Sequence, residues 1–237
     1  PVTEAEARAW LSDGLRVADA PLLDVLDRPD IRGARIDCLP AGALVSVRSE
    51  PAENGFRAVR LADGREGFAP EARLADKRFG EERLRQDGRF SFKALLDRFY
   101  GGEETAFRAQ LLREAKKYLG TQYRWGGRSG FGVDCSGLVS LAYMCAGVNI
   151  FRDARIEPGF PIRRLAPGER LRAGDLLYFP GHVAMYLGGG RYIHATARAG
   201  SNGVVMNSLR RDAPDYRRDL AESMYAAGGI RREERGI

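Results

Sequence analysis

The sequence predicts an α+β protein in two parts: a small β-barrel, then a domain with helices and an antiparallel sheet. The first third of the chain has short apolar runs broken by glycine, proline and aspartate, which is typical of closely spaced strands. The later part combines apolar helical segments with alternating strands. We therefore expect a strand-rich module with a helical linker at residues 1–102 and a second domain at 103–237.

The composition indicates a soluble globular protein with a mild excess of positive charge. Of its 237 residues, 44% are hydrophobic and 30% are charged, and the formal net charge is +6. An anionic partner such as cell-wall polymer would suit that charge, although a solvated arginine-rich surface is the simpler explanation. The basic residues occur in short pairs without interleaved aromatics, so we expect no nucleic-acid partner.

No apolar run reaches the ~20 residues that a membrane-spanning helix needs, so we expect no integral membrane segment. The three cysteines are widely spaced and form neither a disulfide framework nor a metal-site pattern. We expect no metal and no other cofactor. The chain begins Pro-Val-Thr without an initiator methionine, which is consistent with the removal of a leader.

The first part of the chain is predicted to be mostly strands, after a short helical segment near residues 4–11. Apolar runs at 33–40, 43–47 and 56–61 are separated by turn residues. Asp63-Gly64 lies between two alternating segments, which is a strong signal for a hairpin. Many short strands at this spacing favour a small β-barrel.

The connection and the first helices of the second domain follow. Residues 75–102 are highly charged, contain a helical piece at 92–99, and end at Gly101-Gly102. Thr105 is a candidate N-cap for a helix over about 106–119, with apolar residues at helical spacing. Gly120 provides a stop signal.

Cys135 lies where a second helix should begin. The segment 138–146 is apolar almost all round, so this helix is predicted to be central and buried. The free N–H groups and the dipole at a helix N-terminus favour negative charge, and we therefore expect a lowered pKa for the Cys135 thiol. Cys38 and Cys145 are interpreted as inert packing residues.

The only two histidines lie in consecutive predicted strands. The segments 174–179, 182–187 and 191–195 alternate in the manner of strands, with His182 at the start of the second and His194 late in the third. An antiparallel hairpin would bring both rings to one end of the sheet. A thiol at a helix start with two nearby imidazoles is the set of catalytic groups that a cysteine hydrolase uses. In such a site, His194 would orient His182.

The order and spacing of these motifs resemble the NlpC family of cell-wall cysteine peptidases, over roughly residues 106–209. The segment 56–69 resembles the ending of the bacterial SH3-like modules that often accompany such domains. The segments that carry the main resemblance are Tyr123-Arg124-Trp125-Gly126-Gly127, Asp134-Cys135-Ser136-Gly137, Gly174-Asp175-Leu176, Gly181-His182-Val183 and Tyr192-Ile193-His194-Ala195.

This resemblance implies a papain-like α+β core and hydrolysis of peptidoglycan stem peptides, commonly between γ-D-glutamate and the following diamino acid. It implies that Cys135 is the nucleophile, that His182 is the base and that His194 orients His182. The hydroxyl of Tyr123, with the backbone N–H of Cys135, would stabilise the oxyanion. The partner would be peptidoglycan or released murein peptides.

The resemblance also implies residues that contact the substrate, namely Asp134, Ser136 and Asp153, and Trp125 is a further candidate in the cleft. Asp134 as a helix cap, Ser136 as a structural residue and Trp125 as a core residue are the alternatives. The sequence departs from the family subset with SH3-like modules in having no tyrosine within 1–99 and an alanine at position 154. A requirement for a free amino terminus on the substrate is therefore left open.

Two other functions compete with the endopeptidase. The same Cys-His geometry would serve an N-acetylmuramoyl-L-alanine amidase or a thioester acyltransferase, and a non-catalytic cell-wall-binding protein could keep the same fold. The resemblance favours a place in the cell envelope, the periplasm or outside the cell, with cytoplasmic recycling of murein peptides as the alternative.

Overall fold

The computed structural model describes all residues except 1–2, 6–7, 9, 11–13, 78–89 and 233–237. The chain divides into two compact units, Pro1–Lys77 and Arg78–Ile237. This division lies earlier than the domain boundary expected at residue 102, because helix α2 (Phe92–Phe99) packs within the second unit. The linker expected at 75–102 lies partly outside the described residues.

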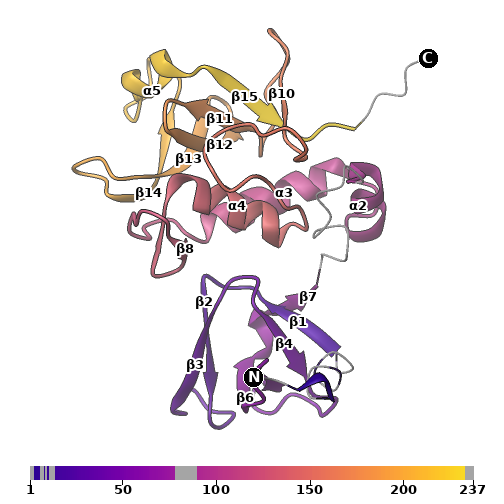
Figure 1. The fold of residues 1–237 in the computed structure, drawn as a ribbon. Coiled ribbons are helices and arrows are strands. Elements are labelled where there is room, and N and C mark those ends of the chain that lie inside the picture. Colours follow the sequence, from indigo (N-terminus) through magenta and orange to yellow (C-terminus); the bar gives the residue numbers. More distant parts are fainter. Residues whose placement is uncertain (1–2, 6–7, 9, 11–13, 78–89, 233–237) are drawn as a thin grey trace. The chain divides into compact units, whose positions relative to one another are not determined.

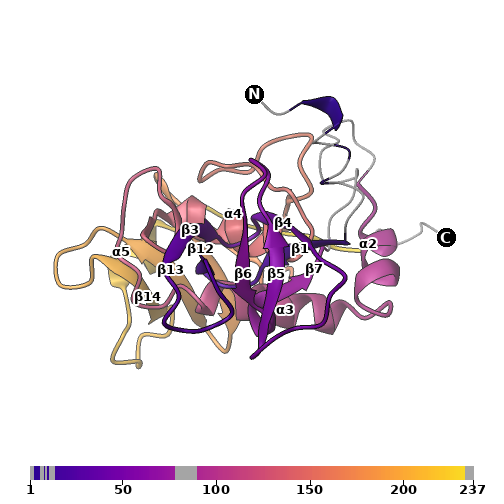
Figure 2. The ribbon, with the colours of Figure 1, turned by 90° about the horizontal axis from the view of Figure 1, so that it is seen from below.

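The first unit is a seven-stranded antiparallel sheet in the order β3-β2-β6-β5-β4-β1-β7. In Figure 2, β4, β5 and β6 can be followed side by side. Among the described strands, the edge strands β3 and β7 do not pair with each other, so the sheet is open yet compatible with an SH3-like module. The strands are β1 (Gly14–Ala18), β2 (Leu22–Leu26), β3 (Arg35–Pro40), β4 (Leu44–Val47), β5 (Phe56–Arg60), β6 (Glu66–Pro70) and β7 (Leu74–Asp76), with a 3-10 turn at Glu71–Arg73 before β7.

Alternation along these strands builds the core of the first unit. Leu23, Val25, Val45 and Val59 are almost completely buried and pack together. The predicted Asp63-Gly64 hairpin is present, since β5 pairs with β6 and Gly64 has a positive φ of 88°. Glycine adopts that conformation without the strain that a side chain would add.

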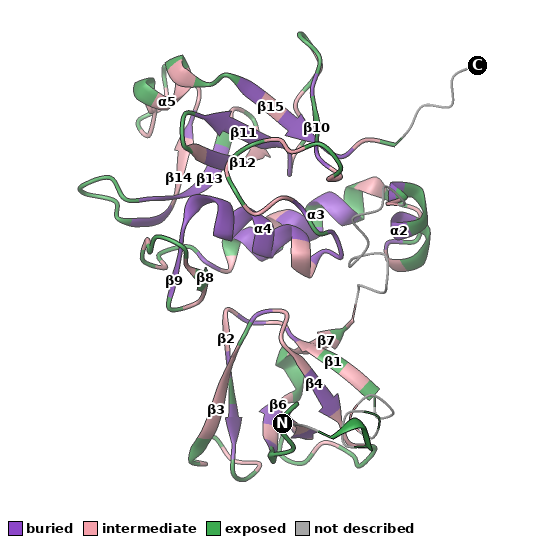
Figure 3. Cartoon of the chain, in the orientation of Figure 1, coloured by how far each residue is buried: buried purple, intermediate pink, exposed green. Residues whose placement is uncertain are grey.

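The second unit contains helices α2, α3 (Glu104–Lys116), α4 (Cys135–Cys145) and α5 (Arg218–Ser223). Figure 1 shows α3 and α4 running beside each other. The ring of Phe92 in α2 meets that of Phe107 in α3 edge-on, with centroids 5.1 Å apart. Helix α4 is buried along most of its length, as its apolar sequence predicts (Figure 3).

A six-stranded antiparallel sheet packs against α4 through β12 and β13. Its order is β10-β15-β11-β12-β13-β14, and the three strands predicted at 174–195 form its centre. A separate pair, β8 and β9, leads into α4. The bounds are β8 (Arg128–Ser129), β9 (Gly132–Val133), β10 (Arg163–Arg164), β11 (Leu176–Phe179), β12 (His182–Gly188), β13 (Arg191–Thr196), β14 (Gly203–Ser208) and β15 (Ala226–Gly229). The predicted α+β fold class is confirmed.

A buried charge cluster ties the helices of the second unit to its sheet. Asp175, which directly precedes β11, is completely buried and accepts two hydrogen bonds of 2.7 Å from Arg231. Arg108 of α3 donates to the same carboxylate over 3.1 Å and to the carbonyl of Ala173 over 2.7 Å. Burial of a carboxylate is costly without such hydrogen-bond partners, so the Gly-Asp-Leu motif has a structural role here.

Within the described residues, no helix combines the length and the apolar character needed to cross a lipid bilayer.

Candidate active site

Cys135 is the first residue of α4, and its surroundings fix the position of its sulfur. Asp134 is the N-cap, and its carboxylate accepts the backbone N–H of Gly137 over 2.5 Å. The thiol is buried, with 6% of the residue exposed. The backbone N–H of Val183 donates a hydrogen bond to the sulfur. The sulfur therefore lies beside the start of β12, next to the residue that follows His182.

Glycines allow the preceding loop to approach the start of α4. A Cβ atom on Gly137 would overlap the carbonyl oxygen of Gly127, and a Cβ on Gly127 would lie 2.5 Å from the carbonyl oxygen of Gly132. The backbone N–H of Asp134 also donates to the Gly127 carbonyl over 3.2 Å. The Trp-Gly-Gly and Asp-Cys-Ser-Gly motifs therefore form one packed unit around the cysteine.

The sheet register brings the two histidine rings together. Tyr186 pairs with Tyr192 across β12 and β13, and directly paired residues in an antiparallel sheet point to the same face. His182 and His194 are each an even number of positions from that pair, so both share its face. Their rings meet, with Nε2 of His182 2.7 Å from Nδ1 of His194. His194 is completely buried.

A fourth residue, Asn207 in β14, continues this chain of contacts. Its Oδ1 lies 2.9 Å from Nε2 of His194, and its Nδ2 donates to the carbonyl of Asp215 over 2.9 Å. Asn207 is not identifiable as a site residue from the sequence alone. The only signal was a lone polar residue after Val204-Val205-Met206, and the register of β14 against β13 is needed to place it beside His194.

The pKa of the Cys135 thiol is raised, contrary to the expectation from the helix N-terminus. Burial is the largest cause, and it outweighs the hydrogen bond from the Val183 N–H, which favours the thiolate. The pKa values of His182 and His194 lie well below their ordinary value of 6.5, chiefly because both rings are buried. Thiol and imidazoles are therefore uncharged at neutral pH.

Arg152 joins the residues on either side of the cysteine. It donates to the Asp134 carboxylate over 2.8 Å and to the Ser136 hydroxyl over 2.5 Å. The same carboxylate accepts the N–H of Gly126 over 2.8 Å. Burial opposes ionisation of Asp134, but the hydrogen bonds from Arg152 and Gly137 outweigh it, and the pKa of Asp134 is lowered. Asp134 is thus both a helix cap and an ion-pair partner.

The remaining predicted site residues differ in their surroundings. Tyr123 is half-buried, and burial, followed by its proximity to Cys135 and Asp134, raises its pKa. Trp125 is 86% exposed, so the alternative that it is a core residue is wrong. Asp153 is exposed directly after Arg152. The structure thus gathers Tyr123, Asp134 and Ser136 around Cys135 and leaves Trp125 and Asp153 at the surface.

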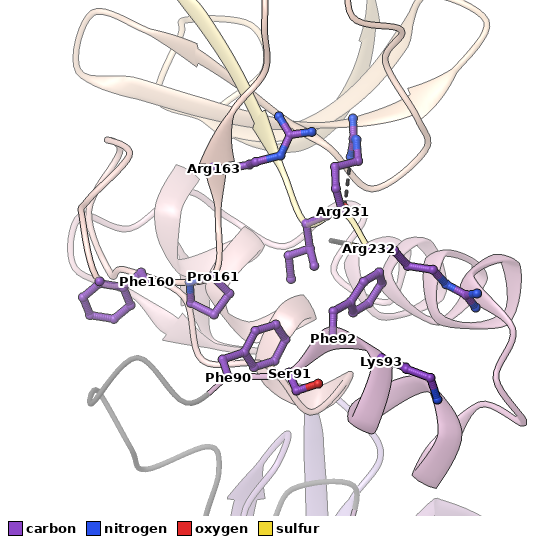
Figure 4. A pocket seen from close by; sticks show the side chains of 11 residues that line it. Phe90, Ser91, Phe92, Lys93, Phe160, Pro161, Arg163, Arg231 and Arg232 are labelled. Carbon is purple, nitrogen blue, oxygen red and sulfur yellow. Dashed lines mark hydrogen bonds between the residues drawn. The ribbon is translucent and has the colours of Figure 1, made fainter. Parts of the chain in front are cut away.

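A separate hollow in the second unit is lined by none of the predicted site residues (Figure 4). Phe90, Phe92 and Pro161 supply apolar walls, and Arg163 and Arg231 lie across from them. Both arginines form ion pairs with Glu169, at 2.9 Å and 3.0 Å respectively. Both arginines are therefore already paired with a carboxylate of the protein itself.

Comparison with known proteins identifies relatives across nearly the whole chain. Residues 120–219 match the NlpC/P60 family. Dipeptidyl-peptidase 6 of Lysinibacillus sphaericus is 39% identical over 229 residues, which cover 96% of this chain and 76% of that protein. The gamma-D-glutamyl-L-lysine dipeptidyl-peptidase of Bacillus cereus is 38% identical over 95 residues, covering 36% of this chain and 27% of that enzyme.

A solved structure shares the fold. The crystal structure of an NlpC/P60 family protein from Bacillus cereus superposes with a TM-score of 0.65 at 23% identity. The match covers 94% of this chain and 65% of that one.

Proposed function

The chain belongs to the NlpC/P60 family of cysteine peptidases, and from this membership we propose that it hydrolyses peptidoglycan stem peptides at the bond between γ-D-glutamate and the diamino acid. Cys135 is the nucleophile, His182 is the base and His194 orients His182. The observation that carries this assignment is the 2.7 Å contact between the two histidines, at the strand whose Val183 N–H binds the sulfur.

The reaction proceeds through a thioester. Because Nε2 of His182 faces His194, Nδ1 is the nitrogen that remains to take the thiol proton. The sulfur attacks the γ-carbonyl carbon, and the protonated His182 then donates its proton to the departing amine of the diamino acid. A water molecule, deprotonated by the same nitrogen, attacks the thioester and releases the free γ-carboxylate and the Cys135 thiol.

The negative oxygen of the tetrahedral intermediate needs hydrogen-bond donors. The backbone N–H of Cys135 lies in the first turn of α4, where the helix dipole favours negative charge. Tyr123 is the second donor, and its raised pKa keeps the hydroxyl protonated at neutral pH. An oxyanion hole is usually formed by two such donors.

Recognition of the amino end of the substrate falls to Asp153. Asp134 already binds Arg152, Gly126 and Gly137, whereas the Asp153 side chain is exposed on the same loop as Arg152. An exposed carboxylate attracts the ammonium of a free N-terminal L-alanine. The names of the dipeptidyl-peptidase relatives support release of an N-terminal dipeptide. Trp125 offers a large exposed ring to the rest of the peptide.

Hydrolysis of synthetic L-Ala-γ-D-Glu-L-Lys and of its meso-diaminopimelate analogue tests the proposal. We expect release of the L-Ala-γ-D-Glu dipeptide by the wild type and its loss in Cys135→Ala. Cys145→Ala is the matched control and should keep the wild-type rate, because Cys145 lies at the far end of α4. Dipeptide release by Cys135→Ala at the wild-type rate would refute the proposed nucleophile.

The same assay identifies the preferred substrate and the competing amidase activity. An N-acetylated substrate should be cleaved at least tenfold more slowly if Asp153 binds the free ammonium, and Asp153→Asn should remove that preference. Digestion of purified sacculi separates the two reactions: a new amine on the diamino acid indicates the peptidase, and a free lactyl carboxylate indicates the amidase. We propose action on cell-wall peptides outside the cytoplasm, in keeping with the peptidoglycan endopeptidases among the relatives.

A further inference from the structure

We propose that Asn207 is a positioning residue that fixes which nitrogen of His194 carries the proton and, through His194, which nitrogen of His182 is free to act as the base. This inference rests on the proposed Cys135–His182–His194 chemistry. It extends the site to a residue that acts through His194.

The orientation of the Asn207 amide follows from its neighbour on the side away from His194. The carbonyl of Asp215 accepts from Asn207 Nδ2 over 2.9 Å, and also from the backbone N–H of Ser208 over 3.1 Å. A carbonyl oxygen can only accept, so the NH₂ side of the amide must face it. Oδ1 therefore faces His194, and because an amide oxygen only accepts, Nε2 of His194 must carry a proton.

The tautomer of His194 in turn determines the tautomer of His182. A neutral imidazole with its proton on Nε2 has a bare Nδ1, which accepts a hydrogen bond. The partner of that atom is Nε2 of His182 at 2.7 Å, so His182 also carries its proton on Nε2. Its own lone pair is then on Nδ1. The Asp215 carbonyl and Asn207 thus set the tautomer of both rings while leaving both uncharged.

The charged groups around the two rings are few among the described residues. Arg217 and Asp219, at the start of α5, form an ion pair of 2.5 Å, and both act on the two histidines. Cys135 and Tyr192 contribute uncharged groups at neutral pH, since the pKa values of both are raised by burial. A carboxylate placed at 207 would add an unpaired negative charge in direct contact with His194.

The tautomers can be observed directly, because the chain contains only two histidines. We expect two-bond ¹H–¹⁵N correlation spectra of the full chain, labelled in histidine and free of a histidine tag, to show both rings protonated on Nε2 at pH 7.5. In Asn207→Leu, a variant of similar volume, the His194 signals should shift toward a mixture of tautomers. A wild-type His194 protonated on Nδ1 would overturn the proposal, and so would unchanged tautomers in Asn207→Leu.

The pH dependence of the kinetics distinguishes a positioning role of Asn207 from a contribution to the stability of the fold alone. Asn207→Leu should lower kcat about tenfold at every pH with an unchanged KM, because His194 loses the acceptor that selects its tautomer. Asn207→Asp keeps the acceptor that faces His194 but loses the donor to the Asp215 carbonyl, and it should recover most of kcat at high pH. Its added charge raises the histidine pKa values, so the acidic limb of kcat/KM should move up by about one pH unit.

Ser208→Ala is the matched control for these variants. Ser208 is buried in the same strand, and its hydroxyl accepts the N–H of Arg210 over 3.0 Å, so its removal costs a comparable hydrogen bond away from the rings. It should leave both tautomers and the acidic limb unchanged. Equal pH profiles for Asn207→Asp and the wild type would refute the positioning role. A wild type that shows the expected tautomers but cleaves no peptide would refute the peptidase and leave the role of Asn207 standing.

Discussion

Arg152 binds the two residues that flank Cys135, and it lies outside both strands that carry the histidines. Its guanidinium bonds Asp134 and Ser136 at once. In Arg152→Met the Asp134 carboxylate loses its cationic partner while remaining largely buried, so we expect a loss of about 2 kcal/mol in unfolding free energy. Urea titration of the intact chain measures this loss.

The control for this substitution is Arg155→Met. Arg155 pairs with Glu157 at 2.8 Å on the surface, where an ion pair contributes less than about 1 kcal/mol. A loss in Arg152→Met no larger than that in Arg155→Met would contradict the role assigned to Arg152.

The buried histidines make stability depend on pH. The pKa of His194 is lowered by burial in the folded chain, so as the pH falls below 6.5 the unfolded chain binds a proton before the folded one does. Unfolding free energy must therefore fall as the pH decreases through that range. In His194→Gln the fall between pH 7.5 and pH 5 should be smaller by about 1–2 kcal/mol.

Urea unfolding curves at three or four pH values across this range give the slopes. Carboxylates contribute equally to both proteins, so the difference between wild type and variant isolates the histidine. Parallel slopes for the two proteins would mean that His194 titrates alike in the folded and unfolded chain.

At this scale the sequence predicts the residues that occur within short motifs and misses those defined by tertiary contact. Cys135 and the two histidines were identifiable because few residues of these types exist in the chain. Asn207 was not, because its partner is reached only through strand pairing. The direction of the thiol pKa was also missed, since the sequence shows the helix start but not how deeply the sulfur is buried.

At the scale of elements, the start of α4 depends on close packing between backbone segments. In Gly137→Ala, the new methyl group would collide with the carbonyl oxygen of Gly127, so the loop before the helix must move. We expect kcat/KM for the stem peptide to fall at least a hundredfold, because a displacement of about 1 Å in a catalytic group has that effect.

Gly14→Ala makes the same chemical change where no atom lies within 4 Å of the new methyl group. It should leave kcat/KM unchanged and stabilise the chain slightly. Wild-type activity in Gly137→Ala would show that the loop accommodates the methyl group without moving Cys135.

The positions of helices and strands are predictable from the sequence where the hydrophobic periodicity is strong. The residues at which these elements begin and end are less predictable. Helix α3 begins at Glu104 with Glu103 as its N-cap, whereas the sequence predicts Thr105 as the N-cap. The central strands β11, β12 and β13 lie where the alternation indicates. Strands β10 and β15 are not predictable from the sequence, because paired arginines and glycines have little intrinsic preference for strands. Strand β15 forms by pairing with β11, and β10 by pairing with β15.

At the scale of the whole molecule, the Asp175 cluster connects α3, the centre of the sheet and the last described residues of the chain. Arg231 is 6% exposed at its side chain and contacts a carboxylate with no exposure at all. Removal of one partner from a buried ion pair costs about 3–5 kcal/mol. Because Arg108 still binds Asp175 in Arg231→Met, we expect a loss of unfolding free energy near the lower end, about 3 kcal/mol.

Differential scanning calorimetry of the full chain records this loss as a lower Tm for the transition of the second unit. Arg232→Met is the neighbouring control, because Arg232 is exposed and, among the described residues, donates to the Gly102 carbonyl at the surface. A Tm for Arg231→Met equal to that of Arg232→Met would contradict the central role of the cluster. In the sequence, Gly174-Asp175 is a weak motif, and nothing indicates that Asp175 pairs with Arg231, which lies 56 residues later.

The buried, neutral thiol of Cys135 has a consequence for its resistance to oxidation. Peroxides and other oxidants react with the thiolate, and we expect slow reaction at Cys135 because the residue is only 6% exposed and burial raises the pKa of its thiol. We therefore expect sulfenic acid to form only slowly at position 135 in the free protein. Under the proposed mechanism, the sulfur becomes reactive when a bound peptide brings the carbonyl carbon to it and the imidazole of His182 removes the proton.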